Sequence, residues 1–197
     1  MELGLFKGFS KASVLLAVIL LVACSPKLDW RTVQSPQEGY TALFPGKPDK
    51  LERHIPYQEL ELQQTLEAVK VDDDIYSITT IKVPVSQAAA TEKIITQLKA
   101  NLLDRAKATG GSVDEESATY QTISRQRLAT KDYFVSIKAN NKVQQLIRVR
   151  WITRQMTSGN SLIYQVSVLH TSPSTDDAKA LLSKEEYANF FDEFYPE

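Results

Sequence analysis

Three arginines near the end of a β-rich segment could bind anions. Over residues 145–154 side chains alternate between the two faces of an expected strand, so Arg148, Arg150 and Arg154 share one face. Guanidinium groups match planar oxyanions, which favours a site for a carboxylate, a phosphate, a lipid headgroup or another anionic partner. The alternative is that the arginines are solvated or pair with acids near the end of the chain. Those acids are Asp176, Asp177, Glu185, Glu186, Asp192 and Glu193.

Other residues that support catalysis or metal binding do not form a known pattern. His54 and His170 lie far apart, and the run at residues 72–74 lacks the alternating acids of a calcium loop, so it predicts a hairpin turn. The sequence has no nucleophile elbow, zinc-protease motif, phosphate-binding glycine loop or dinucleotide fingerprint. We therefore predict no catalytic residue, no metal and no cofactor. The enzyme alternative is a hydrolase whose site is assembled from dispersed residues, with a pocket joining a histidine to an acid and a nucleophile.

The remaining reactive group is the thiol of Cys24, the only cysteine in the chain. Lys7 and Lys11 precede an apolar run over residues 12–23, which is too short to span a bilayer as a helix and is typical of a signal peptide. A single cysteine forms no disulfide within the chain, so the thiol is available for another use. The alternative is a chance cysteine behind an ordinary signal or an uncleaved anchor.

The segment Leu21-Val22-Ala23-Cys24 resembles the bacterial lipobox. The resemblance implies that residues 1–23 are a lipoprotein signal peptide and that Cys24 receives a diacylglycerol and becomes the new N-terminus. Ser25 stands where some lipoproteins carry an inner-membrane retention aspartate. The resemblance therefore implies a lipid-anchored protein of the cell envelope. If the host is Gram-negative, Ser25 favours the outer membrane, with the protein facing the periplasm.

Charge and size limit the partners of the mature chain. The whole chain has 23 basic and 24 acidic residues, and removal of residues 1–23 takes away two lysines and one glutamate, which leaves a net charge of about −2. This balance argues against nucleic-acid binding. Residues 24–29 form a short tether, and Trp30 is expected to be the first packed residue, so the domain begins within roughly 20 Å of the membrane surface.

Residues 30–197 are expected to form one domain, in which strands dominate. The predicted helix at residues 88–109 carries apolar residues on one face and ends at Gly110-Gly111. A second helical region after Pro173 should pack its aromatic residues on the sheet. Strands are expected at residues 40–44, 51–57, 60–71, 75–84, 112–129, 133–139, 144–154 and 162–170. An antiparallel sheet with two helical regions defines an α+β fold.

Several short segments, taken together and in their order along the chain, resemble the PsbP-like domains of bacterial secreted proteins and lipoproteins. They are residues 40–48, Val83-Pro84, Gly110-Gly111, residues 162–166 and residues 190–194. The resemblance implies an α/β/α sandwich around a central antiparallel sheet flanked by helices, and a binding or assembly role more often than an activity. At Lys131-Asp132-Tyr133-Phe134 the chain departs from the family's usual glycine-containing segment.

The leading hypothesis is a non-enzymatic, lipid-anchored envelope protein. Its domain would bind an envelope protein or a small anionic ligand close to the membrane. The predicted binding surfaces are residues 30–48 and the face that carries Arg148, Arg150 and Arg154, here called the arginine stripe. A purely structural surface lipoprotein is the other alternative, favoured if the arginines are neutralised within the protein.

Overall fold

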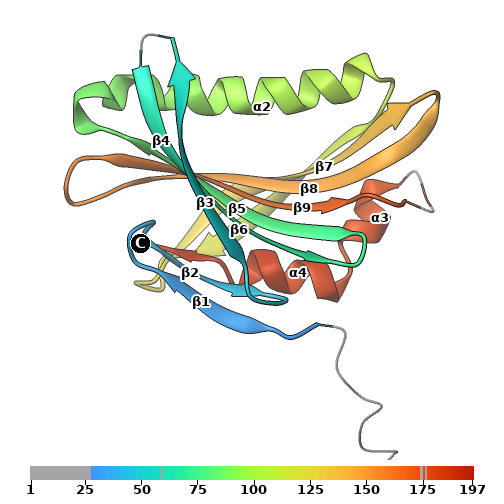
Figure 1. Ribbon diagram of the computed structural model, residues 1–197, viewed down its shortest axis with the longest axis horizontal. Helices are drawn as coiled ribbons and strands as arrows, with labels where there is room; N and C mark the ends of the chain where they lie inside the picture. The colour runs from blue at the N-terminus through green and yellow to red at the C-terminus, as the bar shows by residue number, and fades with distance from the viewer. Residues whose placement is uncertain (1–27, 59, 174, 176) are drawn as a thin grey trace, which may run out of the picture.

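The computed structural model describes residues 28–58, 60–173, 175 and 177–197. Most of this part of the chain forms an antiparallel sheet of seven strands (Figure 1). In order across the sheet, the strands are β3 (Asp49–Tyr57), β4 (Leu60–Val71), β5 (Asp74–Val83), β9 (Ser161–His170), β8 (Lys142–Gln155), β7 (Arg127–Ala139) and β6 (Val113–Gln121). The strands β3 and β6 are therefore its two edges.

A smaller sheet brings the two ends of the described chain together. Strand β2 (Tyr40–Phe44) lies between β1 (Arg31–Ser35) and β10 (Tyr195–Pro196). The helices are the 3-10 helix η1 (Val85–Ala90) and the α-helices α2 (Thr91–Ala108), α3 (Ala178–Leu182) and α4 (Glu185–Asp192). Figure 1 shows α2 along one side of the large sheet, with α3, α4 and the small sheet on the other side.

The face beneath α2 is mainly aliphatic. The helix buries Ile94, Ile95 and Ala106 there. Its partners on the sheet are Leu62, Ile81, Val83, Tyr133, Val135, Ile137, Val149, Trp151 and Ile163. The chain leaves α2 through Gly110, whose φ of +69° favours glycine. A Cβ on Gly111 would lie 1.9 Å from the carbonyl oxygen of Ser136, so this position also requires glycine.

The opposite face is covered by aromatic side chains from the C-terminal segment. The ring of Phe190 lies 5.4 Å from that of Tyr76 and 5.2 Å from that of Phe44, measured between centroids. The ring of Phe194 lies 5.3 Å from that of Tyr164. Such edge-on contacts suit the charge distribution of aromatic rings, so the predicted aromatic packing on the sheet is confirmed.

The expectation of an α+β fold built mainly on antiparallel strands is confirmed. The predicted strand at residues 60–71 matches β4, and the predicted helix at residues 88–109 overlaps η1 and α2. The C-terminal helical region is divided, because α3 ends at Leu182 and α4 begins at Glu185.

One predicted strand has the wrong extent. The expectation was a strand at residues 112–129, a break, and a new strand at residue 133. Instead β6 ends at Gln121, a turn follows, and β7 runs without interruption from Arg127 to Ala139. The residues read as a break, including Asp132, therefore lie in the middle of a strand. This correction matters because Asp132 contacts the arginines.

Candidate functional site

The arginine stripe lies on β8, on the sheet face covered by the C-terminal segment. Val149 and Trp151 point towards α2, whereas Ile152, which shares a face with Arg148 and Arg150, belongs to the aromatic core on the other side. Arg148 is 7% exposed and Arg150 is 1% exposed. Two buried guanidinium groups require partners, because burial of an unpaired charge is costly.

Asp132 of β7 supplies the negative charge between the two buried arginines. It lies directly opposite Arg150 in the β7–β8 register and is 2% exposed. Arg148 donates to Oδ2 of Asp132 from Nε at 3.1 Å and from Nη2 at 2.6 Å. Arg150 donates from Nε to Oδ1 at 2.6 Å and from Nη2 to Oδ2 at 3.0 Å. One carboxylate therefore holds two guanidinium groups.

Each arginine of the stripe also binds a backbone carbonyl of the C-terminal segment. Arg148 Nη1 donates to the carbonyl of Leu182 at 3.1 Å, at the end of α3. Arg150 Nη1 donates to the carbonyl of Phe191 at 2.9 Å, in the last turn of α4. Helix ends leave carbonyls without intrahelical partners, and a cation there is favourable. The two arginines thus fasten both helices to the sheet.

Arg154 extends the same arrangement to the residue that follows β10. Its Nε donates to the carbonyl of Glu197 at 2.7 Å, and it is only partly buried. Nearer the centre of the stripe, the ring of Phe191 lies 4.1 Å from the guanidinium carbon of Arg148, a cation–π contact. The stripe is therefore a binding surface for a segment of its own chain.

The arginines do pair within the protein, but among the described residues Arg148 and Arg150 do not pair with the acids near the end of the chain that the alternative named. The acid that binds Arg148 and Arg150 is Asp132, whereas the C-terminal segment contributes carbonyl oxygens in the contacts described here. The predicted external anion or partner remains a prediction. Arg154 is the member of the stripe that retains substantial exposure to solvent.

A second buried polar cluster lies beneath the turn between β1 and β2. Glu38 and Glu67 are each 7% exposed, and the hydroxyl of Tyr40 donates to Glu67. Burial raises the pKa of the Glu67 carboxyl; a hydrogen bond from Ser35 opposes this shift, and the charge of Glu38 adds to it. Lys50 Nζ lies 3.2 Å from Glu38. This cluster gives the face of the C-terminal segment a titratable group.

The histidines occupy different surroundings. His170 Nδ1 lies 2.7 Å from Oδ1 of Asp74, whose Oδ2 accepts a hydrogen bond from the Tyr187 hydroxyl at 3.1 Å. This arrangement ties α4 to the start of β5. His54 is exposed on β3. Neither histidine lines any of the three hollows described below, so those hollows do not join a histidine to an acid and a nucleophile, as the hydrolase alternative requires.

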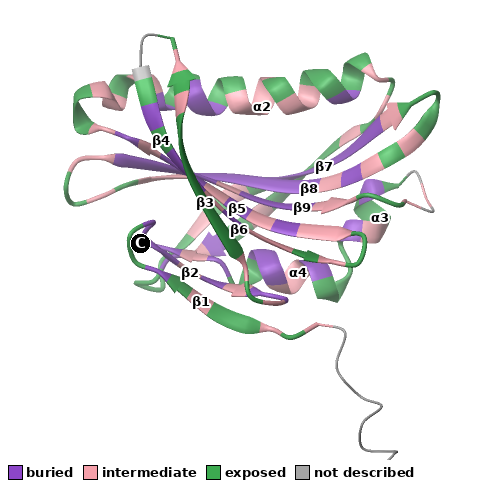
Figure 2. Cartoon of the chain, viewed as in Figure 1, coloured by how far each residue is buried: buried purple, intermediate pink, exposed green. Residues whose placement is uncertain are grey.

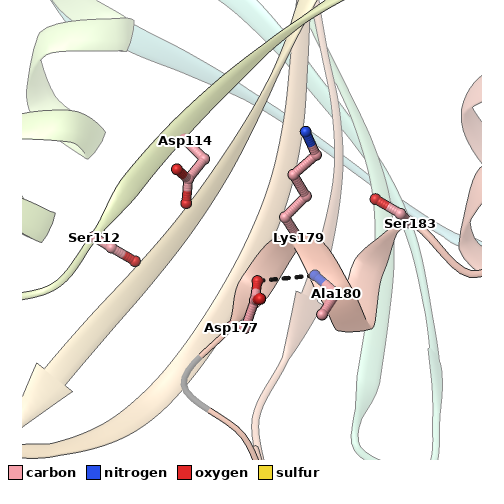
Figure 3. A pocket seen from close by; sticks show the side chains of 6 residues that line it. All are labelled: Ser112, Asp114, Asp177, Lys179, Ala180 and Ser183. Carbon is pink, nitrogen blue, oxygen red and sulfur yellow. Dashed lines mark hydrogen bonds between the residues drawn. The ribbon is translucent and has the colours of Figure 1, made fainter.

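The hollow between α3 and the start of β6 has a volume of about 650 Å³ and opens widely to solvent. Figure 3 shows Asp177 bonded to the backbone of Ala180, with Asp114 on the opposite wall. The Ser112 hydroxyl bonds to Ser136, and Lys179 lies 3.4 Å from Glu116. Several polar groups of this hollow therefore have structural partners.

Two other hollows are smaller. One, of about 320 Å³, is lined by Thr41, Gln121, Thr122, Ile123, Arg125 and Tyr195. The other, of about 410 Å³, lies between the β3–β4 turn and α2 and is lined by Tyr57, Gln58, Glu92, Lys93, Thr96, Gln97 and Ala100. Both are open.

The described residues contain no group of three or more histidine, cysteine, aspartate or glutamate side chains placed to hold a metal ion. In this part of the chain, no helix combines the length and apolar character needed to cross a bilayer. The predicted turn between β4 and β5 consists of Asp72, at a φ of 52°, and Asp73, while Asp74 begins β5. Cys24 and the predicted signal peptide at residues 1–23 lie outside the described residues.

No protein-family model matches the chain, and the comparison with curated proteins gave no match.

Proposed function

We propose that this protein is a lipid-anchored component of the bacterial envelope. Its PsbP-like domain, an α/β/α sandwich flanked by helices, acts as a non-enzymatic binding or assembly module. The observation that carries the proposal is the lipobox-like segment ending at Cys24, immediately before the folded domain. If the host is Gram-negative, Ser25 favours attachment to the outer membrane, facing the periplasm.

The short distance between Cys24 and the first packed residues supports a role close to the membrane. The backbone N–H of Asp29 donates to the carbonyl of Pro45 at 3.2 Å. The ring of Trp30 packs edge-on against Tyr76, with 6.3 Å between centroids. Only four residues separate Cys24 from Asp29, so the anchored domain reaches partners in or near the same membrane.

The anchor is tested with the full chain and Cys24→Ala, each expressed in a bacterium. Membrane partition and the intact mass of the mature protein are measured together. We expect the wild type to be membrane-bound, with an acylated Cys24 as its first residue, and the variant to lose both properties. Equal partition of the two proteins, without acyl mass on the wild type, would overturn the proposal.

A purely structural lipoprotein is the second candidate. It is favoured by the internal contacts of Arg148 and Arg150, which already bind Asp132 and the helix ends. The two roles differ in the behaviour of Arg154. If the domain binds a small anion at the stripe, inorganic phosphate or phosphatidylglycerol vesicles should raise the Tm of the wild type more than that of Arg154→Ala. Equal shifts would favour the structural role.

A further inference from the structure

The edge strand β3 is the most exposed strand of the large sheet. Residues 49–54 are all exposed, and Figure 2 shows β3 as a largely green strand at the front of the molecule. Among the described residues, β4 is the only strand paired with β3. The outer edge of β3 therefore presents backbone N–H and C=O groups that a further strand can bind.

The residues of this edge match an antiparallel copy of themselves. Residues directly opposite each other in an antiparallel pair share a face of the sheet. With Leu51 on a two-fold axis, Lys50 of each copy lies opposite Glu52 of the other, and Asp49 lies opposite Arg53. Leu51, which is 55% exposed, then meets its own counterpart. We propose that β3 pairs with β3 of a second copy in this register, joining the two large sheets into one.

Neighbouring registers are less favourable because they place like charges opposite each other. An axis through Lys50 pairs two lysines, an axis through Glu52 pairs two glutamates, and an axis through Arg53 pairs two arginines. The axis through Leu51 also leaves Pro56, which has no N–H to donate, outside the paired residues 49–53. Among these registers, charge complementarity therefore favours the one with its axis at Leu51.

Existing contacts of Lys50 fit this arrangement. Its Nζ lies 2.9 Å from Glu52 and 3.2 Å from Glu38 within the same copy. In the dimer, each Lys50 lies between Glu52 of its own chain and Glu52 of the second copy. The charges on this face then alternate across the two-fold axis.

The opposite edge offers no such self-complementarity. Strand β6 carries Asp114, Glu115 and Glu116 in succession, and an axis through any of them places identical acids opposite each other. Strand β6 also contacts α4 and β10, whereas β3 is exposed over most of its length. The pairing is therefore specific to one edge.

The proposed dimer is compatible with attachment of both copies to one membrane. A two-fold axis normal to the sheet continues each face of one copy into the same face of the other. Trp30 packs on the face covered by α4, so both chains enter their domains on the same side of the joined sheet. This membrane arrangement rests on the proposed function, whereas the pairing itself does not.

The dimer should be weak in dilute solution. Stable interfaces usually bury about 1,200–2,000 Å², and five paired residues form a short contact by that measure. Anchoring two copies in one membrane raises their effective concentration. We therefore expect pairing mainly at high protein concentration or on a membrane.

Disulfide crosslinking of the full-length protein tests the register. Cβ atoms of directly opposed residues lie about 4.5–5.5 Å apart, close enough for a disulfide after a small adjustment. Mild oxidation of concentrated, detergent-purified Leu51→Cys should give dimers on a non-reducing gel. The matched control is His54→Cys, because residue 54 is also exposed on the same strand. In the proposed register the two cysteines at position 54 would lie about 20 Å apart. Wild type controls for Cys24.

The proposal is overturned if Leu51→Cys forms no more dimer than wild type, or if His54→Cys crosslinks equally well. Because the purified protein is concentrated, this result does not depend on the lipid anchor. Cys24→Ala in the Leu51→Cys background separates pairing from anchoring. If this variant forms no dimer in cells but still crosslinks at high concentration in vitro, both the pairing and the proposed anchor are supported.

Charge exchange provides a second test in the Leu51→Cys background. Arg53→Asp places Asp49 opposite an acid and should lower the dimer yield about fivefold. Adding Asp49→Arg restores opposite charges and should restore the yield. Arg53 also donates to Gln64 within its own chain at 2.5 Å, but loss of that bond would not be rescued by Asp49→Arg. Failure of the double variant to recover would contradict the register.

Discussion

The two faces of the large sheet are stabilised by different interactions. Beneath α2 the contacts are mainly aliphatic, as for Val149 against the helix side of the sheet. On the opposite face Arg148, Arg150 and Asp132 form a buried ionic cluster among aromatic rings, and Glu67 lies buried on the same side. One face therefore depends on volume and apolar area, while the other also depends on partnered charges and on pH.

The largest expected effect is that of Asp132→Ala. It leaves Arg148 and Arg150 buried without their carboxylate and should lower the free energy of unfolding by about 3–5 kcal/mol. Denaturant unfolding of the purified protein measures the loss. The neighbouring Lys131→Ala is the control, since its ion pair with Glu115 is exposed to solvent and should contribute little to stability. Equal losses in the two variants would contradict the role assigned to the cluster.

Val149→Ala sharpens the comparison because Val149 lies between the two arginines in the chain but points to the other face. The residue is fully buried, so removal of its methyl groups should cost about 2 kcal/mol. This loss should be the same at pH 5 and pH 8, because no charge is changed. Unfolding at both pH values measures it, and a strongly pH-dependent loss would argue against the separation of the two faces.

Glu67→Gln should stabilise the protein at neutral pH. Burial raises the pKa of Glu67 in the folded protein, so its stability contribution is greatest at low pH and is lost as pH rises through that folded-state value. Gln cannot ionise, so the variant should gain up to about 1 kcal/mol at pH 7 over wild type and little at pH 4. Unfolding across this range measures the gain.

Glu61→Gln is the control for this measurement, because Glu61 is exposed on the same strand and the same face. It should change the free energy of unfolding by less than about 0.5 kcal/mol at either pH. A destabilised Glu67→Gln at pH 7 would show that ionised Glu67 is favoured in the folded protein.

The smallest effect is expected at Lys99 of α2. Its Nζ lies 5.8 Å from the ring centroid of Tyr133 and 5.9 Å from that of Trp151. Lys99→Gln should cost about 0.5 kcal/mol and alter the fluorescence of Trp151. Trp30 is the other tryptophan, so the same variant in a Trp30→Phe background isolates the signal. A loss as large as that of Val149→Ala would mean that this aliphatic face also depends on charge.

The sequence predicted the parts of this fold that depend on local patterns. The alternation over residues 145–154 correctly separated Arg148 and Arg150 from Val149, and α2 ended at Ala108, just before the glycines expected to terminate it. Strands β1 and β10 were not predicted, because both are short and β10 contains Pro196. Their pairing depends on β2, a contact that local sequence does not encode.

The partners of the arginines were harder to predict for a physical reason. A charged residue among strand formers indicates a turn, so Asp132 was placed in a break between strands. It is tolerated in the middle of β7 because Arg150 lies opposite it on β8 and Arg148, two residues away on the same face, also binds it. The carbonyls of Leu182 and Phe191 carry no side-chain signal at all. The arginine partners are therefore set by contacts between strands and with helix ends, which local sequence patterns do not reveal.

The position of β2 between β1 and β10 also sets an order of events during synthesis. Thr41 pairs with Tyr195, so the small sheet remains incomplete until nearly the whole described chain has left the ribosome. Contacts between such distant residues form slowly, because a long loop must close first. A chain that cannot finish folding early remains unfolded enough to pass through a translocation channel. For a protein exported in an unfolded state, this late closure would keep the domain ready for translocation.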